Sequence, residues 1–491
     1  MWTRESLHKL VAEKFQDYLF VVVSNREPYV HSHVYGAIHC DMPPSGLTTA
    51  LDPVMRACGG TWIAHGSGNA DRETVDERDR VQVPPHDPQY TLRRIWLSKE
   101  EEDGYYYGFS NDAVWPLCHI AYTRPMFNEA EWNTYRRVNE RFAEVVIEEV
   151  GTSKAFVFVQ DYHLMLLPRL LREASPNLIV AQFWHIPWPN REAFRVCPWQ
   201  HEILEGLLGN HLLGFHIRYH CNNFLDTVDR AIEAKVDWDR YEVTRGGKKT
   251  AVRPFPISID FEEVCQRARQ KEVEAEMERL RKSLELEDRL IGMGLDRIDY
   301  TKGIPDRLRA FDRFLERYPD YRNRVVFIQT GVPSRVHIPA YRRINDDIDS
   351  LIEEVNWKYE SDHWKPIVDL RGPLPPLTVM ALRRLANFAV VSSLHDGMNL
   401  VAKEFVASCV DEDKVLILSP FTGAARELTD AILVNPYATD HFAEAIKEAL
   451  EMPVAERQRR MRRMRAVVQE NNVYKWAADI VTEMAKLEFG G

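Results

Sequence analysis

The stretch FAVVSSLHDGMNLVAKE, residues 388–404, predicts a buried β-strand, a glycine turn and the first turns of an α-helix. Its apolar part, Phe388–Ser393, has the length of a strand rather than of a helix. Gly397 marks the turn, and the helix is expected to begin near Asn399. Because a continuously apolar strand is buried on both faces, this stretch predicts a parallel sheet covered by helices.

The same strand–turn–helix pattern recurs along the chain. The other apolar runs are Leu19–Ser24, Ala155–Val159, Leu178–Phe183, Leu212–Phe215, Leu290–Met293, Arg324–Gln329, Ile367–Leu370, Lys414–Leu418 and Ala431–Val434. A chain of 491 residues exceeds the usual size of one hydrophobic core, so two α/β domains with parallel sheets are expected. The run Val252–Asp260, which contains two prolines, is predicted to connect them, and a long charged helix is expected from Phe261 to about Leu286.

The composition of the chain argues against several kinds of partner and binding site. The formal net charge of -11 at pH 7 disfavours a nucleic-acid partner, because a polyanion gains no general attraction. The seven cysteines are scattered singly without a CxxC pair, which predicts reduced thiols and no zinc site. The N-terminal residues lack the apolar core of a signal peptide, and no run approaches the roughly 18 apolar residues that span a bilayer. We therefore expect a cytoplasmic protein with no membrane or nucleic-acid partner.

Polar residues follow the predicted strands at equivalent places. They are Ser24-Asn25-Arg26, Asp161-Tyr162-His163, His185–Pro189, Arg297 with Lys302, Arg335, and Asp396–Asn399. Ligands of doubly wound sheets bind beyond the carboxyl ends of the strands. These positions therefore predict the ligand-binding edges of the two sheets.

Two of these sites are suited to anions. Arg297 and Lys302 can converge on a diphosphate, and a transferase needs such cations because the leaving nucleoside diphosphate gains negative charge as the sugar bond breaks. The alternative is a salt bridge from Arg297 to Asp296 or Asp299. In Asp396–Glu404, free N–H groups at a helix start can bind an anion, and Glu404 can accept hydrogen bonds from ribose hydroxyls. The alternative there is ordinary helix capping with a favourable charge near the N-terminus.

Four motifs resemble those of glycosyltransferase family 20, and they occur in the family's order. They are DYH at 161–163, HIPWP at 185–189, RIDYTKG at 297–303 and DGMNLVAKE at 396–404, within a resemblance from Val21 to about Trp476. The resemblance implies the GT-B fold, in which two Rossmann-like domains enclose the active site in the cleft between them. It implies an acceptor-binding domain at 1–255, a nucleotide-sugar-binding domain at 256–470, and a C-terminal helix at 471–491 that crosses back to the first domain.

The resemblance also implies roles for individual residues. Those implied to be catalytic are Asp161, His185, Arg297, Lys302 and Asp396. Those implied to bind the sugar nucleotide are Gly46, His185, Arg297, Lys302, Asp396, Met398, Asn399, Leu400, Val401 and Glu404. Those implied to bind a phosphorylated acceptor are Arg26, Tyr106, Trp115, Asp161 and Arg335. Plain core packing is the alternative for the two aromatic residues.

The resemblance implies a reaction as well. The family transfers a hexose from a nucleotide to a sugar phosphate with retention of anomeric configuration, without a metal or a cofactor, and its members are often homo-oligomers. We therefore expect glucose transfer from a nucleotide-glucose, UDP-glucose first, to glucose 6-phosphate, which gives trehalose 6-phosphate. The alternatives are synthesis of glucosylglycerol phosphate, pseudo-glycosyl transfer between cyclitols, and a non-catalytic sugar-phosphate sensor.

Three features depart from the family pattern. A long loop, Glu27 to Pro44, is expected after Arg26, and Ser45 precedes Gly46 where the family typically has two glycines. His395 replaces the arginine often found before the DGMN motif. Because a neutral imidazole removes a fixed positive charge near the transferred sugar, we expect these departures to affect substrate choice more than the type of reaction.

Overall fold

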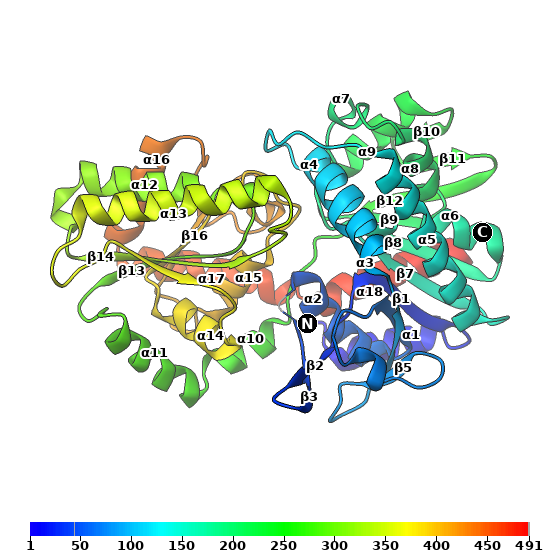
Figure 1. The fold of residues 1–491 in the computed structure, drawn as a ribbon, viewed down its shortest axis with the longest axis horizontal. Coiled ribbons are helices and arrows are strands. Elements are labelled where there is room, and N and C mark those ends of the chain that lie inside the picture. Colours follow the sequence, from blue (N-terminus) through cyan, green and yellow to red (C-terminus); the bar gives the residue numbers. More distant parts are fainter. Residues whose placement is uncertain (44, 490–491) are drawn as a thin grey trace. The chain divides into compact units, whose positions relative to one another are not determined.

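The computed structural model describes residues 1–43 and 45–489, which fold into two compact units (Figure 1). Unit 1 comprises residues 1–257 together with the chain from Val473 onward, and unit 2 comprises Ser258–Asn472. Pro44, in the loop expected after the first strand, and Gly490 and Gly491, in the expected C-terminal helix, lie outside the described residues. Among the residues that are described, no helix is both long and apolar enough to cross a membrane.

Unit 1 is built on a ten-stranded sheet in the order β10-β11-β12-β9-β8-β7-β1-β4-β6-β5. Its strands are β1 (Leu19–Arg26), β4 (Thr61–His65), β5 (Arg80–Val83), β6 (Tyr90–Ile95), β7 (Ala155–Gln160), β8 (Leu178–Phe183), β9 (Leu212–Phe215), β10 (Lys235–Asp237), β11 (Glu242–Arg245) and β12 (Lys248–Pro254). The strands from β12 to β6 run parallel, and antiparallel strands lie at the two edges. All residues of β7 and β8 are buried, as expected for apolar strands covered on both faces.

Helices surround this sheet. They are α1 (Arg4–Lys14), α2 (Gly46–Cys58), α3 (Lys99–Glu102), α4 (Trp115–Cys118), α5 (Glu129–Val150), α6 (Leu167–Ala174), α7 (Arg191–Phe194), α8 (Gln200–Leu207), α9 (Arg218–Ala231) and α18 (Val473–Phe489), with 3₁₀ turns η1 (Asp71–Glu73) and η3 (Tyr162–Leu164). A π-helix, η2 (Asp103–Val114), leads directly into α4. Because π-helical segments are rare and concentrate at functional sites, η2 indicates a functional site in this part of unit 1.

The segment after β1, expected to be a loop, forms a hairpin instead. Its strands β2 (Val30–Val34) and β3 (Ala37–Asp41) pair antiparallel. The turn residues Tyr35 and Gly36 have φ angles of 48° and 83°, the left-handed pair that a two-residue hairpin turn requires. The expectation was wrong because the polar side chains of these strands leave no apolar run, and apolar runs were the signal for a strand.

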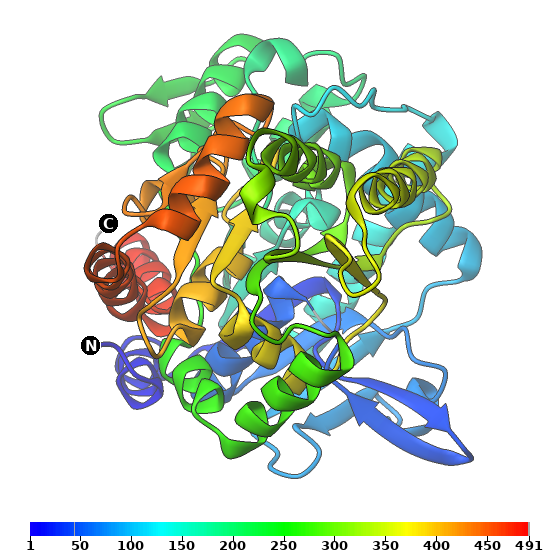
Figure 2. The same cartoon turned by 90° about the vertical axis from the view of Figure 1, so that its left-hand side faces the viewer.

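Unit 2 contains a parallel six-stranded sheet in the order β15-β14-β13-β16-β17-β18. Its strands are β13 (Leu290–Ile298), β14 (Val325–Pro333), β15 (Ile367–Arg371), β16 (Phe388–Val391), β17 (Val415–Leu418) and β18 (Ile432–Leu433). Its helices are α10 (Phe261–Ala268), α11 (Lys271–Ser283), α12 (Ile304–Arg317), α13 (Pro339–Tyr359), α14 (Pro376–Leu385), α15 (Leu400–Ser408), α16 (Thr439–Glu451) and α17 (Val454–Glu470), with 3₁₀ turns η4 (Tyr300–Lys302), η5 (Pro319–Tyr321) and η6 (Gly423–Arg426). Within this unit α12 and α13 cover one face of the sheet and α11 and α14 lie on the other (Figure 1), and Figure 2 shows the same layers after a quarter turn.

The structure bears on two expectations near the junction of the units. The predicted connection Val252–Asp260 contains the boundary between the units, Ile257 to Ser258, although its first residues belong to β12, the last parallel strand of the first sheet. The prediction for the helix that follows was wrong. The single long helix expected from Phe261 is broken, because Gln270 is extended with φ -68° and ψ 142° between α10 and α11. The break lets α10 pack against α15 and α17 while α11 packs against α14. One straight helix could not turn its buried side toward both sets of neighbours.

Candidate active site

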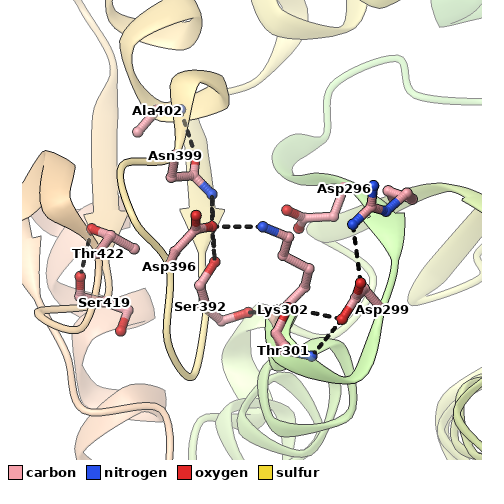
Figure 3. Close-up of polar contacts among 12 residues, drawn as sticks. Asp296, Asp299, Thr301, Lys302, Ser392, Asp396, Asn399, Ala402, Ser419 and Thr422 are labelled. Atoms are coloured by element: carbon pink, nitrogen blue, oxygen red, sulfur yellow. Dashed lines mark hydrogen bonds and ion pairs between the residues drawn. The ribbon is translucent and has the colours of Figure 1, made fainter. Parts of the chain in front are cut away.

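Lys302 and Asp396 form an ion pair in unit 2 although they lie 94 residues apart in sequence (Figure 3). The Nζ–Oδ2 distance is 2.6 Å, and the two side chains are 16% and 14% exposed. The pair forms because β13 and β16 are adjacent parallel strands, so the turns that follow them meet at one edge of the sheet. Burial lowers the pKa of Lys302, but the carboxylates of Asp396, Asp296 and Asp299 together outweigh burial and raise that pKa above its ordinary value. Lys302 is therefore a fixed cation at this edge.

Further donors hold the Asp396 carboxylate in place. Its Oδ2 atom accepts hydrogen bonds from Ser393 Oγ and from Asn399 Nδ2, each at 3.1 Å. Asn399 also begins α15, where its Oδ1 atom accepts from the Ala402 N–H at 3.1 Å. Asn399 thus orients the Asp396 carboxylate and also caps α15. The segment shows the helix capping that was the alternative interpretation, and it also holds a cluster of polar side chains.

The rest of the 396–404 segment forms the beginning of helix α15. Leu400 and Val401 are the first residues of α15, where the N–H groups have no carbonyl partner within the helix. Met398 is 2% exposed, and its carbonyl accepts from the Ala424 N–H at 2.9 Å. The Glu404 carboxylate accepts a hydrogen bond from Arg383, which is 10% exposed at its side chain. The segment therefore presents backbone N–H groups with a carboxylate one turn further along the helix.

Arg297 lies at the end of β13, where its guanidinium contacts Asp299 at 3.1 Å. The salt-bridge alternative for Arg297 is thus realised with Asp299, whereas Asp296 pairs with Arg307 at 2.7 Å. The Arg297 side chain is nevertheless 36% exposed, so the pairing does not enclose it. Arg335, after β14, lies 3.8 Å from the same Asp299 carboxylate.

In unit 1, Asp161 and His185 are held together at the ends of β7 and β8. The His185 N–H donates to Asp161 Oδ1 at 3.1 Å, and His185 Nε2 lies 2.9 Å from Gln160 Oε1. Burial lowers the pKa of His185 to about 3, so the ring is neutral near pH 7. A neutral imidazole beside a carboxylate is suited to hydrogen bonding with hydroxyl groups rather than to binding an anion.

The predicted acceptor aromatics of unit 1 lie around the η3 turn. Tyr106, on the π-helix, stacks on His163 with ring centroids 5.6 Å apart. Trp115 is 7% exposed and packs against Tyr162 at 5.9 Å. The core-packing alternative therefore describes Trp115 well, while Tyr106 remains partly exposed.

The remaining predicted residues of unit 1 lie at the ends of elements. Arg26 is the exposed last residue of β1. Gly46 is the first residue of α2, and Ser45 caps that helix by accepting from the Thr48 N–H at 3.5 Å. Ser45, one of the departures from the family pattern, thus has a structural role as a helix cap. Within the described residues, no group of three or more His, Cys, Asp or Glu side chains could hold a metal ion.

Sequence reasoning gave no binding or catalytic role to several residues that organise these sites, although it named Asp299 as an alternative partner of Arg297. They are Gln160, Asp299, Tyr341, Arg383 and Ser393. Asp299 and Ser393 stand inside or beside quoted motifs, so proximity in sequence could have pointed to them. Tyr341 and Arg383 lie on helices remote from the motifs, and nothing in the local pattern distinguishes them.

Comparisons with known proteins extend over nearly the whole chain. The family model of glycosyltransferase family 20 matches residues 18–486. The trehalose-6-phosphate synthase of Mycobacterium marinum is 37% identical over 492 residues, which cover 98% of this chain and 97% of that protein. The bifunctional trehalose-6-phosphate synthase/phosphatase of Thermoproteus tenax is 38% identical over 472 residues, which cover 94% of this chain but only 62% of that longer protein.

Solved structures show the same fold. The alpha,alpha-trehalose-phosphate synthase (UDP-forming) of Burkholderia xenovorans, in complex with glucose-6-phosphate, is 30% identical with a TM-score of 0.84 and covers 95% of this chain and 99% of its own. A trehalose-6-phosphate structure from E. coli bound with UDP-2-fluoro glucose is 30% identical with a TM-score of 0.85, over 95% of this chain and 99% of its own. The expected fold class, α/β with two Rossmann-like domains of the GT-B type, is confirmed. Since the family model and these relatives match nearly the whole length, the chain belongs to glycosyltransferase family 20.

Proposed function

We propose that the chain is a retaining glycosyltransferase that moves glucose from UDP-glucose to glucose 6-phosphate and releases trehalose 6-phosphate and UDP. The observation that carries this proposal is the Lys302–Asp396 pair, which places a fixed cation and a hydroxyl-binding carboxylate side by side at one strand edge. The relatives support the substrates, since one solved structure contains UDP-2-fluoro glucose and another glucose-6-phosphate.

In this proposal most of the residues that bind the sugar nucleotide belong to unit 2. Arg297 and Lys302 bind the diphosphate, and the N–H groups at Asn399–Val401 contact the phosphates and the sugar. Glu404 accepts hydrogen bonds from the ribose hydroxyls, oriented by its contact with Arg383. Asp396 binds hydroxyls of the glucose, together with His185, Gly46 and Met398.

The acceptor is bound through its phosphate and its sugar ring. Arg26, Tyr106, Trp115 and Arg335 bind the phosphate, because guanidiniums, a phenol hydroxyl and an indole N–H can saturate the oxygens of a dianion. Asp161 binds the acceptor sugar, and its carboxylate is already fixed by the His185 N–H.

The chemistry needs positioning and charge stabilisation rather than a covalent enzyme intermediate. The bond between glucose C1 and the β-phosphate oxygen breaks while the acceptor hydroxyl oxygen bonds to C1 on the same face. The acceptor proton passes to the leaving phosphate, which becomes part of UDP. Arg297 and Lys302 stabilise the negative charge that develops on this leaving group.

We place the protein in the cytoplasm, the location expected from its unpaired cysteines. All seven cysteines are free thiols, and five of them are buried. A reducing compartment preserves such thiols. Fractionation of the source cells with an antibody to the chain tests this placement, and recovery of the protein outside the cytoplasm would contradict it.

A substrate panel tests the proposed activity. The protein is incubated with UDP-, GDP- or ADP-glucose and with glucose 6-phosphate or glycerol 3-phosphate, and nucleotide release and the sugar product are followed. We expect trehalose 6-phosphate from UDP-glucose and glucose 6-phosphate. Turnover only with glycerol 3-phosphate would indicate the glucosylglycerol-phosphate alternative, and tight sugar-phosphate binding without turnover would indicate the sensor. Nucleotide release that needs no acceptor would indicate a hydrolase.

A further inference from the structure

One fully buried carboxylate in unit 2 contacts two of the cations discussed above. Asp299 follows β13, its side chain is 0% exposed, and its Oδ2 atom lies 3.1 Å from the Arg297 guanidinium and 3.8 Å from that of Arg335. Arg297 lies at the end of β13 and Arg335 follows β14, and the two residues bind different substrates in the proposed function. A single aspartate therefore lies between a cation for the sugar nucleotide and a cation for the acceptor.

Tyr341, on α13, completes the link to Arg335. Its hydroxyl donates to Asp299 Oδ2 at 3.0 Å and accepts from Arg335 NH1 at 2.6 Å. Tyr341 is 0% exposed, so water does not compete strongly for these bonds. The Arg335 backbone adopts a left-handed φ of 50°, and its carbonyl accepts a hydrogen bond from the Ile338 N–H at 2.9 Å.

The other oxygen of Asp299 shapes the turn that carries Lys302. Oδ1 accepts from the Thr301 N–H at 3.0 Å and from the Thr301 hydroxyl at 2.8 Å. These bonds cap the 3₁₀ turn η4, whose last residue is Lys302. Asp299 is thus connected to all three cations of unit 2 that the sequence singled out.

The net charge of this cluster is positive, which favours the binding of an anion. Burial alone would raise the pKa of Asp299, but Arg297, Arg335 and Lys302 outweigh it and hold that pKa below its ordinary range. One ionised carboxylate facing two guanidiniums leaves a positive charge for phosphate groups. The carboxylate also orients the guanidiniums, since a buried charge requires paired partners with good geometry.

We propose that Asp299 is a positioning residue shared by the two substrates, holding Arg297 toward the donor diphosphate and Arg335 toward the acceptor phosphate. This inference rests on the proposed function, which assigns those two arginines to the two substrates. Asp299 itself touches neither substrate and acts through the arginines.

The decisive variant is Asp299→Asn, which keeps the size of the side chain but replaces one accepting oxygen with an NH₂ group. Because a hydrogen bond to a charged group contributes about 1.5–3 kcal/mol, we expect KM for UDP-glucose and KM for glucose 6-phosphate each to rise about 10- to 100-fold. Arg297→Ala should affect mainly the nucleotide, and Arg335→Ala mainly the sugar phosphate. A rise in only one KM for Asp299→Asn, or in neither, overturns the proposal.

Two further variants separate positioning from stability. Tyr341→Phe removes the hydroxyl that links Arg335 to Asp299, so KM for glucose 6-phosphate should rise about tenfold while KM for UDP-glucose stays within about twofold. Asp52→Asn is the matched control, because Asp52 is a buried carboxylate of unit 1 that pairs with Arg56 at 2.7 Å and accepts from the Tyr29 and Tyr90 hydroxyls. It should lower Tm and leave both KM values unchanged. If Asp299→Asn does not fold, an unchanged sugar-phosphate KM in Tyr341→Phe still overturns the proposal.

Direct binding distinguishes failure of this inference from failure of the proposed function. Calorimetric titration of wild-type protein and variants with UDP alone and with glucose 6-phosphate alone measures each site without turnover. Absence of turnover in wild-type protein would count against the proposed function only. Loss of both affinities in Asp299→Asn supports the shared role, and retention of either affinity counts against it.

Discussion

At the scale of single residues, three members of the candidate site adopt backbone conformations that are unfavourable for residues with a side chain. The φ angle is 69° at Asp161, 50° at Arg335 and 81° at Asn399. Such conformations cost on the order of 1–3 kcal/mol each and persist where the surrounding structure over-determines them. At Asp161 the backbone is held by a hydrogen bond, which its N–H donates to the Phe183 carbonyl at 2.8 Å. The left-handed backbone turns these side chains away from the strand direction toward their polar partners.

Asn399→Asp should damage catalysis while preserving the helix. An aspartate still caps α15, but it places a second carboxylate where Nδ2 now donates to Asp396 Oδ2 at 3.1 Å. We expect kcat/KM to fall about 30- to 100-fold, because a donor is exchanged for a like charge. Tm, measured by calorimetry, should change little.

Asn399→Ser is the matched control for that substitution. Serine also caps helices well but adds no charge beside Asp396. Its loss of kcat/KM should be clearly smaller than that of Asn399→Asp. Equal losses in the two variants would contradict the electrostatic explanation.

His185 should make the protein sensitive to acid. Its pKa is lowered from 6.5 to about 3 by burial, so between these values the unfolded chain binds more protons than the folded one. The free energy of unfolding therefore falls as pH drops from about 6.5 toward 3. His185→Gln should lose less stability over this window than wild-type protein, as measured by urea unfolding at pH 7, 5.5 and 4.5. An identical pH dependence would show that the imidazole is not held neutral.

At the scale of elements, the last helix of the chain stabilises the first sheet. Trp476 of α18 packs against Phe183 and Phe158, with ring centroids 5.1 and 5.9 Å apart. Arg253 of β12 donates to Glu483 of the same helix at 2.9 Å. Since the buried strand β8 leads into the His185 site, α18 supports that site from a distance in sequence of nearly three hundred residues.

Trp476→Ala should destabilise unit 1 strongly. The indole is 3% exposed, and removing a buried tryptophan costs about 3–5 kcal/mol. Urea unfolding followed by circular dichroism should show an earlier transition for unit 1. Glu483→Gln, which weakens a partly exposed ion pair on the same helix, should cost no more than about 1 kcal/mol. A comparable loss in both variants would contradict the importance of aromatic packing.

At the scale of the whole molecule, the two units differ in how the chain builds them. Unit 2 is one uninterrupted segment, Ser258–Asn472, and it contains Arg297, Lys302, Asp396 and Glu404. Unit 1 needs two separate pieces of chain, residues 1–257 and the segment from Val473 onward. The residues of unit 2 that we propose to bind the nucleotide thus belong to a continuous unit with its own core.

This difference predicts how fragments should behave. Fragment 258–472 should unfold cooperatively and bind UDP in calorimetry without catalysing transfer. Fragment 1–257 should be much less stable than the same fragment joined to residues 473–489 by a flexible linker. Only the joined fragment contains Trp476, which covers the Phe183 side chain of the first sheet. Equal stability of the two unit 1 fragments would show that α18 is dispensable.

Apolar periodicity predicted the strands of the buried cores well. β8 and β9 have the predicted bounds, while β13 extends to Ile298 beyond the predicted Met293 because it pairs with β14 as far as Pro333. β4 and β6 were missed, since Thr61–His65 and Tyr90–Ile95 mix charged and polar residues with apolar ones. In those strands burial depends on neighbours in the sheet rather than on a local apolar run.

The sequence by itself determined the parallel strands at the centre of the two sheets, the strand-end positions of Arg297, Lys302 and Asp396, and the family, because each of these is recorded in short runs of neighbouring residues. Only the tertiary structure decided that Lys302 pairs with Asp396 and that Asp299 lies between two arginines. The Lys302–Asp396 and Arg335–Asp299 contacts join residues at the ends of different strands, and their proximity follows from the strand order β14-β13-β16. Strand order is settled by long-range packing, which no local stretch of sequence records.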